Sequence, residues 1–408
     1  MNNRISLALF LAGFATFSLL YAAQPVLPDL VRTFQIQPAT SSLALSLATG
    51  SLAVAIVMAG AWSEGRDRKR LMLASIVLAA LLNLLAAWLP SWPGVLVART
   101  LSGLALGGVP AVAMAHLADE LPPDALGRSM GLYVAGTAFG GMSGRMGVSL
   151  LSDGWGWRVG LSGVALVALL AAVAFAWLLP AARPPAGRSA GSEPTPDRMG
   201  WSAHIQAWRT HWHTPGIAGL VGIAFLGMGS FVTVYNYIGF HLMAAPYHLS
   251  AATLSLVFLA YVFGIGSSSL AGTLQQRWGR GPVMGTGLAL CLLGLLLSLS
   301  TPLALVVAGV VVLTFGFFLA HAVASGWVGS KARAFKGHAA SLYLLAYYIG
   351  SSVMGSLGGL AWQAGQWTGV AAFTAALLVL ALLCARHVMR QADSPCDAAA
   401  PMRATPGR

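Results

Sequence analysis

Charged side chains are scarce in this chain of 408 residues. Only 8% of its residues are Asp, Glu, Lys or Arg, whereas a soluble protein carries about 25%. Hydrophobic residues make up 57%, and they form runs of about 20, each long enough to cross the hydrocarbon core of a bilayer as a helix. This balance excludes a soluble protein and predicts an all-α membrane protein.

Cysteine is also scarce, with three in the chain. Cys291 and Cys384 fall within apolar runs, and Cys396 lies in the polar C-terminal tail. A disulfide framework or a metal site needs more cysteines at closer spacing. The stretch GWVGSK near Gly326 lacks the glycine spacing of a phosphate-binding loop. We therefore expect no metal, no cofactor and no enzyme activity, and an ATP-driven pump is disfavoured.

What the chain does have is a regular series of apolar runs between polar breaks, which predicts twelve membrane-spanning helices. The predicted spans are residues 5–27, 41–62, 71–89, 93–117, 126–151, 156–179, 215–243, 250–274, 281–299, 303–328, 337–361 and 367–388. We expect an N-terminal six-helix bundle over residues 1–180, a cytoplasmic linker over 181–213, a C-terminal six-helix bundle over 214–388 and a cytoplasmic tail over 389–408.

The basic residues predict the orientation. If both termini are cytoplasmic, all but four of the 23 Lys and Arg residues fall in cytoplasmic segments, as basic loops prefer. The exceptions are Arg32 and Arg158 in outer loops and Arg99 and Arg145 within spans. Because the basic residues are spread over many short loops, the net charge of +12 reflects topology and attraction to anionic lipid. A nucleic-acid partner is not expected.

Acidic residues are missing from the middle of every predicted span. Asp29 and Asp153 fall at the outer surface, and the other acids of the total of 11 fall at the inner surface or in the tail. A proton carrier would therefore be Asp29, a histidine, or absent. His321 is the only histidine well inside a span, and imidazole titrates in the range that suits proton exchange. The alternative is a structural histidine bonded to a neighbouring carbonyl.

The two halves of the chain repeat each other at an offset of about 212 residues, which indicates a duplicated six-helix unit. The matched pairs are Phe17 with Phe231, Tyr21 with Tyr235, Tyr133 with Tyr343, Gly140 with Gly350 and Trp157 with Trp367. Such a duplication predicts two pseudo-symmetric bundles packed face to face, with a site between them near the bilayer midplane. Rocking of one bundle against the other would give alternating access.

The loop after the second span carries a motif that repeats in the second half. The first copy has Gly60, Glu64, Arg68 and Lys69, and the second has Gly272, Arg277 and Arg280 with Gln276 in place of the acid. This motif resembles the signature of the major facilitator superfamily, although Gly65 and Asp67 depart from it. The strings GLYVAGTAFGGMSGRMG and GMGSFVTVYNYIGF are similar to bacterial drug and metabolite efflux permeases of the acriflavine-sensitivity group.

The resemblance implies a monomeric secondary transporter in the inner membrane of a bacterium. It would export a small amphipathic or drug-like molecule, as an antiporter if protons are exchanged, and would confer drug resistance. Its partners would be the substrate, the lipid bilayer and, in the coupled case, protons. Two alternatives stay open: a membrane receptor or sensor that retained the transporter fold, and a permease for a metabolite such as a sugar or an amino acid.

Two arginines within spans are the sharpest candidates for substrate binding or coupling. An arginine at the centre of a membrane helix costs about 2.5–3.5 kcal/mol on insertion scales, so Arg99 and Arg145 should each face a partner, a polar cavity or water. For Arg145 the alternative is snorkelling to the headgroups. Arg99 matches an arginine that proton-coupled members of the resembled family carry in the fourth helix. In the repeat, Arg145 aligns with Gly355, so the charge is not duplicated.

Further candidates follow from the family's helix positions. The first and seventh helices line the cavity in the resembled family, which points to Tyr21, Gln24, Tyr235, Asn236 and Tyr237, with Tyr261, Tyr347 and Tyr348 as weaker candidates. Their phenol and amide groups could orient a substrate. The alternative is hydrogen bonding between helices.

Three further features have structural predictions. Gly131, Gly140 and Gly144 match a helix-five signature of drug antiporters and, with Gly350, are expected to allow close helix packing. The loop motif predicts an inner gate, in which Glu64 caps a helix of the opposite bundle. The stretch WSAHIQAWRTHWH at residues 201–213 predicts a helix at the membrane interface.

Overall fold

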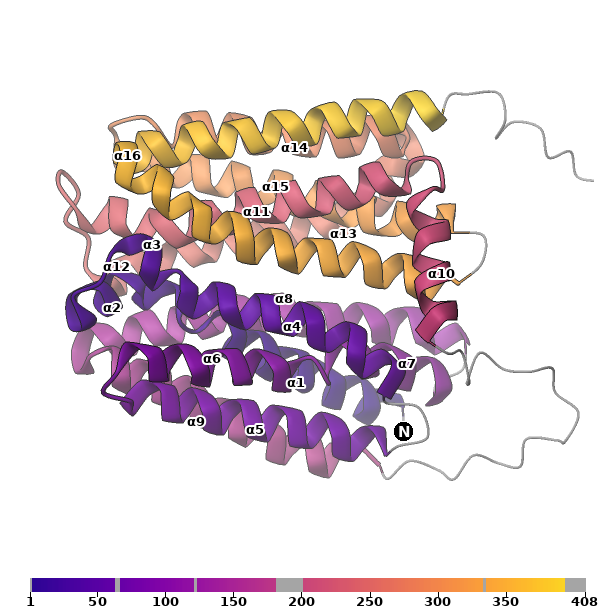
Figure 1. Ribbon diagram of the computed structural model, residues 1–408, viewed down its shortest axis with the longest axis horizontal. Helices are drawn as coiled ribbons and strands as arrows, with labels where there is room; N and C mark the ends of the chain where they lie inside the picture. The colour runs from indigo at the N-terminus through magenta and orange to yellow at the C-terminus, as the bar shows by residue number, and fades with distance from the viewer. Residues whose placement is uncertain (1, 63–66, 121–122, 181–200, 333–334, 393–408) are drawn as a thin grey trace, which may run out of the picture.

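Two bundles of parallel and antiparallel helices lie side by side in the computed structural model (Figure 1). The structure describes residues 2–62, 67–120, 123–180, 201–332 and 335–392, and these ranges are helical with short connections and no strand. The twelve predicted spans are all present as helices. The predicted all-α fold with two six-helix bundles is therefore confirmed.

The N-terminal bundle holds the elements up to α9. They are α1 (Asn2–Tyr21), η1 (Gln24–Val26), α2 (Leu27–Phe34), α3 (Pro38–Ser41), α4 (Leu43–Trp62), α5 (Arg68–Trp88), α6 (Trp92–Leu106), α7 (Pro110–Glu120), α8 (Pro123–Trp155) and α9 (Trp157–Leu178). The predicted span 93–117 is divided between α6 and α7, because Gly107, Gly108 and Pro110 interrupt the helix.

The C-terminal bundle holds the later elements. They are α11 (Ile217–Met243), α12 (Ala251–Ser255), η3 (Leu256–Leu259), α13 (Ala260–Trp278), α14 (Arg280–Leu297), α15 (Leu303–Lys331) and α16 (Lys336–Ala392). Non-helical dihedral angles at Gly365 and Gln366 divide α16 into the last two spans. The predicted linker helix is present as α10 (Trp201–Trp212), which lies across one end of the bundles (Figure 1).

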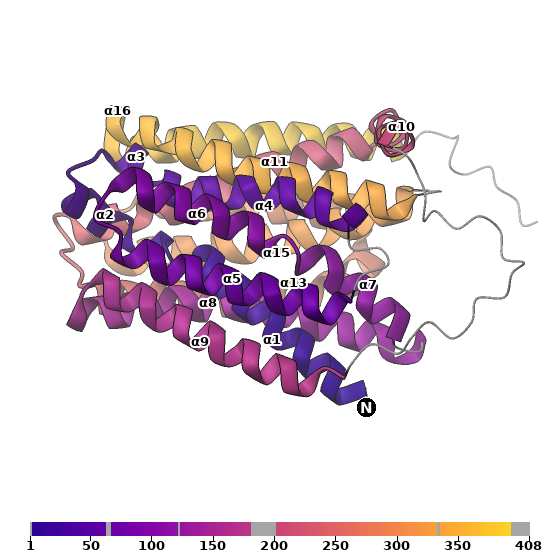
Figure 2. The same ribbon diagram turned by 60° about the horizontal axis from the view of Figure 1, so that its bottom comes forward.

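The two ends of the molecule can be named from these elements. We call the end with α10 and the chain's N-terminus the linker end, and the opposite end, with α2, α3 and α12, the far end (Figures 1 and 2). Between the two ends the outward surface is strongly apolar: Leu170 is 70% exposed and Trp177 86% exposed. Large apolar side chains at such exposure would be unfavourable in water, so this surface fits contact with lipid.

Glycines hold paired helices close together in both bundles. A Cβ at Gly140 would lie 2.2 Å from the carbonyl oxygen of Phe14, and a Cβ at Gly350 would lie 2.1 Å from that of Phe225. The two crossings, α8 on α1 and α16 on α11, are equivalent in the repeat, and Gly144 packs against Ser18 in the same way. In membranes, small residues are what permit such close approach of helix backbones.

Gly131 differs from this pattern. A Cβ built at Gly131 would meet no atom within 4 Å, and the residue lines a cavity instead. Its predicted role in helix packing is therefore wrong for this structure, because this part of α8 faces open space and not a neighbouring helix. Gly136, which was not among the predicted packing glycines, does pack closely against α1: a Cβ there would lie 2.3 Å from the carbonyl oxygen of Phe10.

Candidate substrate-binding cavity

A cavity of about 530 Å³ lies between the two bundles. Residues of α1 and α8 line it from the N-terminal bundle, and residues of α11, α13, α15 and α16 line it from the C-terminal bundle. A third of its lining residues are Phe or Tyr: Phe17, Tyr21, Phe231, Tyr261, Phe317, Phe318 and Tyr347. Volume and composition are those of a site for a small organic molecule.

The cavity deepens from the linker end toward the far end. Gly131, Ser269 and Ser325, which line it nearest the linker end, are exposed. Arg145 and Tyr261, which line its other end, are buried. Access in this conformation is therefore from the linker end.

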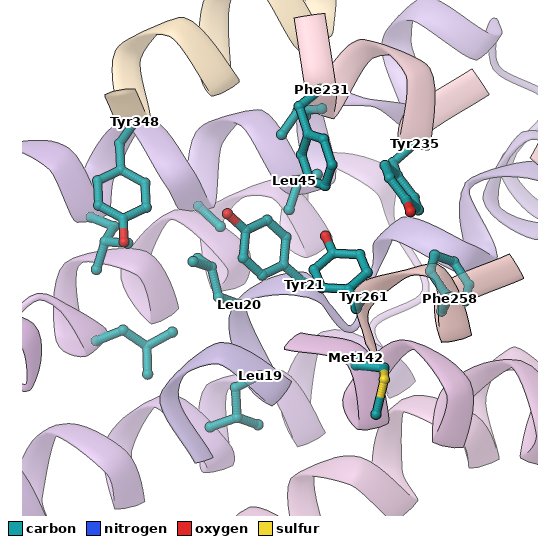
Figure 3. Close-up of a cluster of buried hydrophobic side chains, with 14 of the residues drawn as sticks. Leu19, Leu20, Tyr21, Leu45, Met142, Phe231, Tyr235, Phe258, Tyr261 and Tyr348 are labelled. Atoms are coloured by element: carbon teal, nitrogen blue, oxygen red, sulfur yellow. The ribbon is translucent and has the colours of Figure 1, made fainter. Parts of the chain in front are cut away.

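Arg145 of α8 lies at the deep end of the cavity with its guanidinium among aromatic rings. Its Cζ is 4.1 Å from the ring centre of Tyr21 and 4.9 Å from that of Tyr261, distances at which a cation is attracted by the ring face. Its Nε donates to Oε1 of Gln24 at 2.5 Å and its Nη1 to the carbonyl oxygen of Gly141 at 2.6 Å. Figure 3 shows Tyr21 beside Tyr261, in a cluster that also contains the rings of Phe231, Tyr235 and Phe258.

Gln24 connects this arginine to the opposite bundle. Its Nε2 donates to Oδ1 of Asn236 at 2.7 Å, and both amides are buried. The two residues are separated by 212 positions in the chain, and the bond joins η1 of the N-terminal bundle to α11 of the C-terminal bundle. Asn236 in turn donates to the carbonyl oxygen of Gly355 at 3.4 Å. A chain of hydrogen bonds therefore crosses between the bundles beyond the deep end of the cavity.

Other contacts between the bundles lie beside this chain of hydrogen bonds and at the far end itself. Oγ of Ser352 donates to the carbonyl oxygen of Ser46 at 2.6 Å. The backbone N–H of Ala252, in the first turn of α12, donates to Oδ1 of Asp153 at 3.2 Å, an arrangement that a helix N-terminus favours. Gly359 packs directly on Ala39. These contacts close the far end.

Arg99 of α6 lies outside the cavity lining and is tied into the N-terminal bundle. Its Nε donates to the carbonyl oxygen of Ala44 at 2.9 Å, and its two terminal nitrogens donate to those of Leu19 at 3.0 Å and Leu20 at 2.6 Å and to Oδ1 of Asn83. These bonds join α1, α4, α5 and α6. They offset the desolvation cost of the buried guanidinium, although no carboxylate is among these partners. This arrangement favours a structural role for Arg99.

His321 lies on the cavity wall, in α15. Its Nδ1 is 3.0 Å from the hydroxyl of Tyr343, and its ring stacks on Phe317 with a centroid distance of 5.8 Å. Its bonding partner is thus a tyrosine of α16 and not the backbone carbonyl of the structural alternative. Asp29, the other candidate for proton exchange, pairs with Arg32 at 2.5 Å at the far end, away from the cavity.

The tyrosine candidates divide into two groups. Tyr21 lines the cavity, and so do Tyr261 and Tyr347, which were the weaker candidates from the sequence. Tyr235 and Tyr237 are buried outside the lining: the Tyr235 hydroxyl lies 2.8 Å from that of Thr314, and the Tyr237 hydroxyl donates to the carbonyl oxygen of Gly355 at 3.2 Å. Both tyrosines therefore form hydrogen bonds between helices, which was the alternative to a role in substrate binding.

Phe17, Phe317 and Phe318 also line the cavity and were not predicted. They lie in uniformly apolar spans, where a phenylalanine that faces a cavity has the same sequence context as one that faces lipid. Only the repeat carries a signal, since Phe17 aligns with Phe231 and both line the cavity.

The residues of the predicted inner gate lie at the linker end. Gly60 lies near the end of α4 and Arg68 begins α5, while Glu64 falls outside the described residues. Lys69 donates to the carbonyl oxygen of Leu179, after α9, and Asp67 caps α5 by accepting from the backbone N–H of Arg70.

In the second copy of the motif, Arg280 donates to Oγ of Ser330 at 2.5 Å, and Arg277 is exposed. A Cβ at Gly272 would meet nothing within 4 Å. The bonds described for Lys69, Asp67 and Arg280 therefore each stay within one bundle, and the cross-bundle cap by Glu64 stays a prediction. Among the described residues no cluster of His, Cys, Asp or Glu could hold a metal ion.

The fold, with a cavity between duplicated bundles, is that of a membrane transporter. A sequence model described as the Major Facilitator Superfamily matches residues 7–264 and 237–404. The chain is 43% identical over 388 residues to the inner membrane transport protein YnfM of Escherichia coli, covering 95% of this chain and 91% of that protein. The chain belongs to the major facilitator superfamily and is a multi-pass membrane transporter.

Two other similarities are more limited. The chain is 29% identical over 167 residues to a chloramphenicol resistance protein of Streptomyces lividans, covering 41% of this chain and 42% of that one. A bacterial homologue of the human lysosomal transporter Spinster, in an inward-facing and occupied conformation, superimposes with a TM-score of 0.75 at 15% identity, over 95% of this chain and 96% of that one. The second similarity shows the fold alone.

Proposed function

We propose that the protein exports a small amphipathic molecule by alternating access through the cavity between its bundles. The cavity carries this proposal: it is large enough for an organic molecule, has an aromatic wall with few polar groups, and is closed by contacts between the bundles at one end only. Substrate would enter from the linker end and leave after the far-end contacts separate.

The basic residues support the orientation in this proposal. Arg68, Lys69, Arg277, Arg280 and Lys331 all lie at the linker end, and basic loops near membrane helices are retained in the cytoplasm. With this end cytoplasmic, the conformation is open to the inside, and both termini are cytoplasmic. The similarity to a chloramphenicol resistance protein over part of the chain supports export and a role in drug resistance.

We assign the moving units as residues 1–180 and 214–388, joined by the linker 181–213 and followed by the tail 389–408. Each unit holds its own internal ties, such as Arg99 in the first and the Tyr235–Thr314 bond in the second. Rocking would therefore break only the contacts between the bundles. One chain contains the whole cavity, so we propose that a monomer in the bacterial inner membrane is sufficient.

Proton coupling, if the export is coupled, is assigned to His321. No described residue that lines the cavity carries a carboxylate, and Asp29 is paired with Arg32. His321 faces both the cavity and a tyrosine of α16, so a change in its charge would be felt by a substrate and by the packing of α15 on α16. A sugar permease is less well supported, because apolar and aromatic side chains outnumber the polar ones in the lining.

The test uses everted membrane vesicles from an overexpressing strain. A growth screen across toxic compounds first identifies a candidate, and uptake of that compound into energised vesicles is then measured. Gly131→Phe is expected to block uptake, since the new ring would occupy the cavity where a Cβ meets no neighbour within 4 Å. Gly285→Phe is the matched control, because Gly285 on α14 has equally open surroundings outside the lining.

Uptake in wild-type and Gly285→Phe vesicles with none in Gly131→Phe vesicles supports transport through this cavity. Equal uptake in both variants would refute the cavity as the route. A compound that binds the purified protein with no uptake in any vesicle would support the receptor alternative.

A further inference from the structure

Among the described residues that line the cavity, Arg145 is the one Lys, Arg, Asp or Glu. Arg145 lines its deep end, and no Asp, Glu or Lys is found among the described residues of its wall. Within the described part of the chain no carboxylate pairs with Arg145. A buried cation without a counter-ion is unfavourable in a site of low dielectric constant, and a bound anion would relieve that cost.

The aromatic groups near Arg145 are not free to bind a second cation. Tyr21 and Tyr261 already direct their ring faces at the guanidinium, at 4.1 Å and 4.9 Å. A cationic substrate seeking these rings would approach a charge of the same sign at a distance where, away from bulk water, repulsion is strong. The aromatic wall at this end therefore disfavours amines, although aromatic cavities elsewhere often bind them.

Arg145 also keeps donors for a ligand. Two hydrogen bonds of its guanidinium are formed, from Nε and Nη1, while the group has five N–H donors. Arg99 by contrast forms four, from all three of its nitrogens, and lies away from the cavity. Gly141 leaves room beside the group, since a Cβ there would lie 3.2 Å from Nη1 of Arg145. Arginine is suited to bind a carboxylate or a phosphate through two parallel bonds.

We propose that the transported substrate is an organic anion with an apolar, aromatic-sized body. This rests on the proposed transport function and specifies its substrate class. The anionic group is held by Arg145 at the deep end, and the body lies against Phe17, Phe317 and Phe318. The serine hydroxyls of Ser268 and Ser269 lie on the wall nearer the linker end, where polar substituents are tolerated.

The experiment compares probes that share a body and differ only in charge. Each triplet contains a carboxylate, its primary amide and the corresponding amine, built on a phenyl, a naphthyl or an indolyl ring: 4-phenylbutyrate, 4-phenylbutyramide and 4-phenylbutylamine are the first. Binding to the purified full-length protein in detergent is measured by calorimetry at pH 7. The carboxylate should bind at least about tenfold more tightly than its amide, which corresponds to one charge-assisted hydrogen bond, and the amine should bind most weakly.

Variants then assign the preference to its residue. Arg145→Gln should bind the carboxylate and the amide equally, and Arg145→Lys should keep part of the preference, because it keeps the charge and loses the paired geometry. If no carboxylate of the three triplets binds wild-type protein more tightly than its amide and its amine, the inference is refuted. This comparison uses wild-type protein alone and does not depend on the folding of any variant.

The inference and the transport function fail separately. If the growth screen and vesicles identify exported compounds that are neutral or cationic, the anion site is refuted and transport stands. If the carboxylates bind with the expected order and no compound is taken up by vesicles, transport is refuted and the anion site stands.

Discussion

Removal of the hydrogen bond between Gln24 and Asn236 should shift the protein toward a conformation that is open at the far end. The bond joins the two bundles at 2.7 Å between buried amides, so it exists only while the far end is closed. The bond from Arg145 to Gln24 lies within the N-terminal bundle, so rocking of whole bundles should leave it intact. Replacing Gln24 or Asn236 by leucine should therefore change the equilibrium through one bond.

The size of the shift follows from that bond. A neutral hydrogen bond contributes about 1 kcal/mol net, and a bond between membrane helices about 0.6 kcal/mol on average. A difference of 1 kcal/mol changes a ratio of two populations about fivefold. The other closing contacts, among them Ser352 on Ser46 and Ala252 on Asp153, remain, so the far end should still be closed in a substantial fraction of molecules.

The measurement is the distribution of distances between two spin labels at the far end. Trp155, at the end of α8, and Ala244, after α11, are exposed positions in different bundles, and labels there require replacement of the three native cysteines. Gln24→Leu and Asn236→Leu should each increase the population at longer distance about threefold to fivefold.

A double-mutant cycle and a control decide the outcome. Because either substitution breaks the same bond, the double variant should shift no further than the larger single shift. Ser18→Ala is the control, since it removes a bond to the carbonyl oxygen of Gly140 at 3.0 Å within one bundle, and it should leave the distances unchanged. Additive shifts in the double variant, or an equal shift in Ser18→Ala, would refute the role given to this bond.

Other substitutions test the remaining assignments. Arg99→Met should lower the free energy of unfolding by at least about 3 kcal/mol, because it removes four buried hydrogen bonds that a charged group donates. Folded, stable Arg99→Met protein that fails only in proton movement would contradict the structural role. Gly140→Ala should lower the thermal midpoint, as its Cβ would meet a backbone oxygen at 2.2 Å, while Gly131→Ala should not; equal midpoints would contradict the packing account. His321→Gln should abolish pH change on substrate addition to vesicles yet preserve binding of the same compound, and unchanged proton movement would exclude His321 as the carrier.

Much of the fold was predictable because the bilayer imposes a length on each span. Twelve apolar runs in two repeated sets predicted the helices, and the breaks at Gly365 and before Pro110 fall where helix-breaking residues stand. The packing glycines Gly140 and Gly350 were predictable from the repeat, since equivalent helix crossings require small residues at equivalent places.

The site was predictable only in part. Among the candidates, Arg145, Tyr21 and His321 line the cavity, whereas Tyr235 and Tyr237 on the pseudo-symmetric helix do not. Each step along a helix turns the side chain by about 100°, so the direction of any one residue depends on the rotation of its helix. In a membrane protein that rotation leaves little trace in hydrophobicity, because lipid and core are both apolar.

The contrast between the two buried arginines separates what each level decides. The sequence alone determined that the chain crosses the membrane, that its halves repeat, and that Arg99 and Arg145 must each find a polar environment, because hydropathy and the cost of a buried charge are local properties. Only the tertiary structure decided which environment: backbone carbonyls for Arg99 and a cavity with an aromatic wall for Arg145. The partners come from helices far apart in the chain, and their approach depends on how whole helices pack.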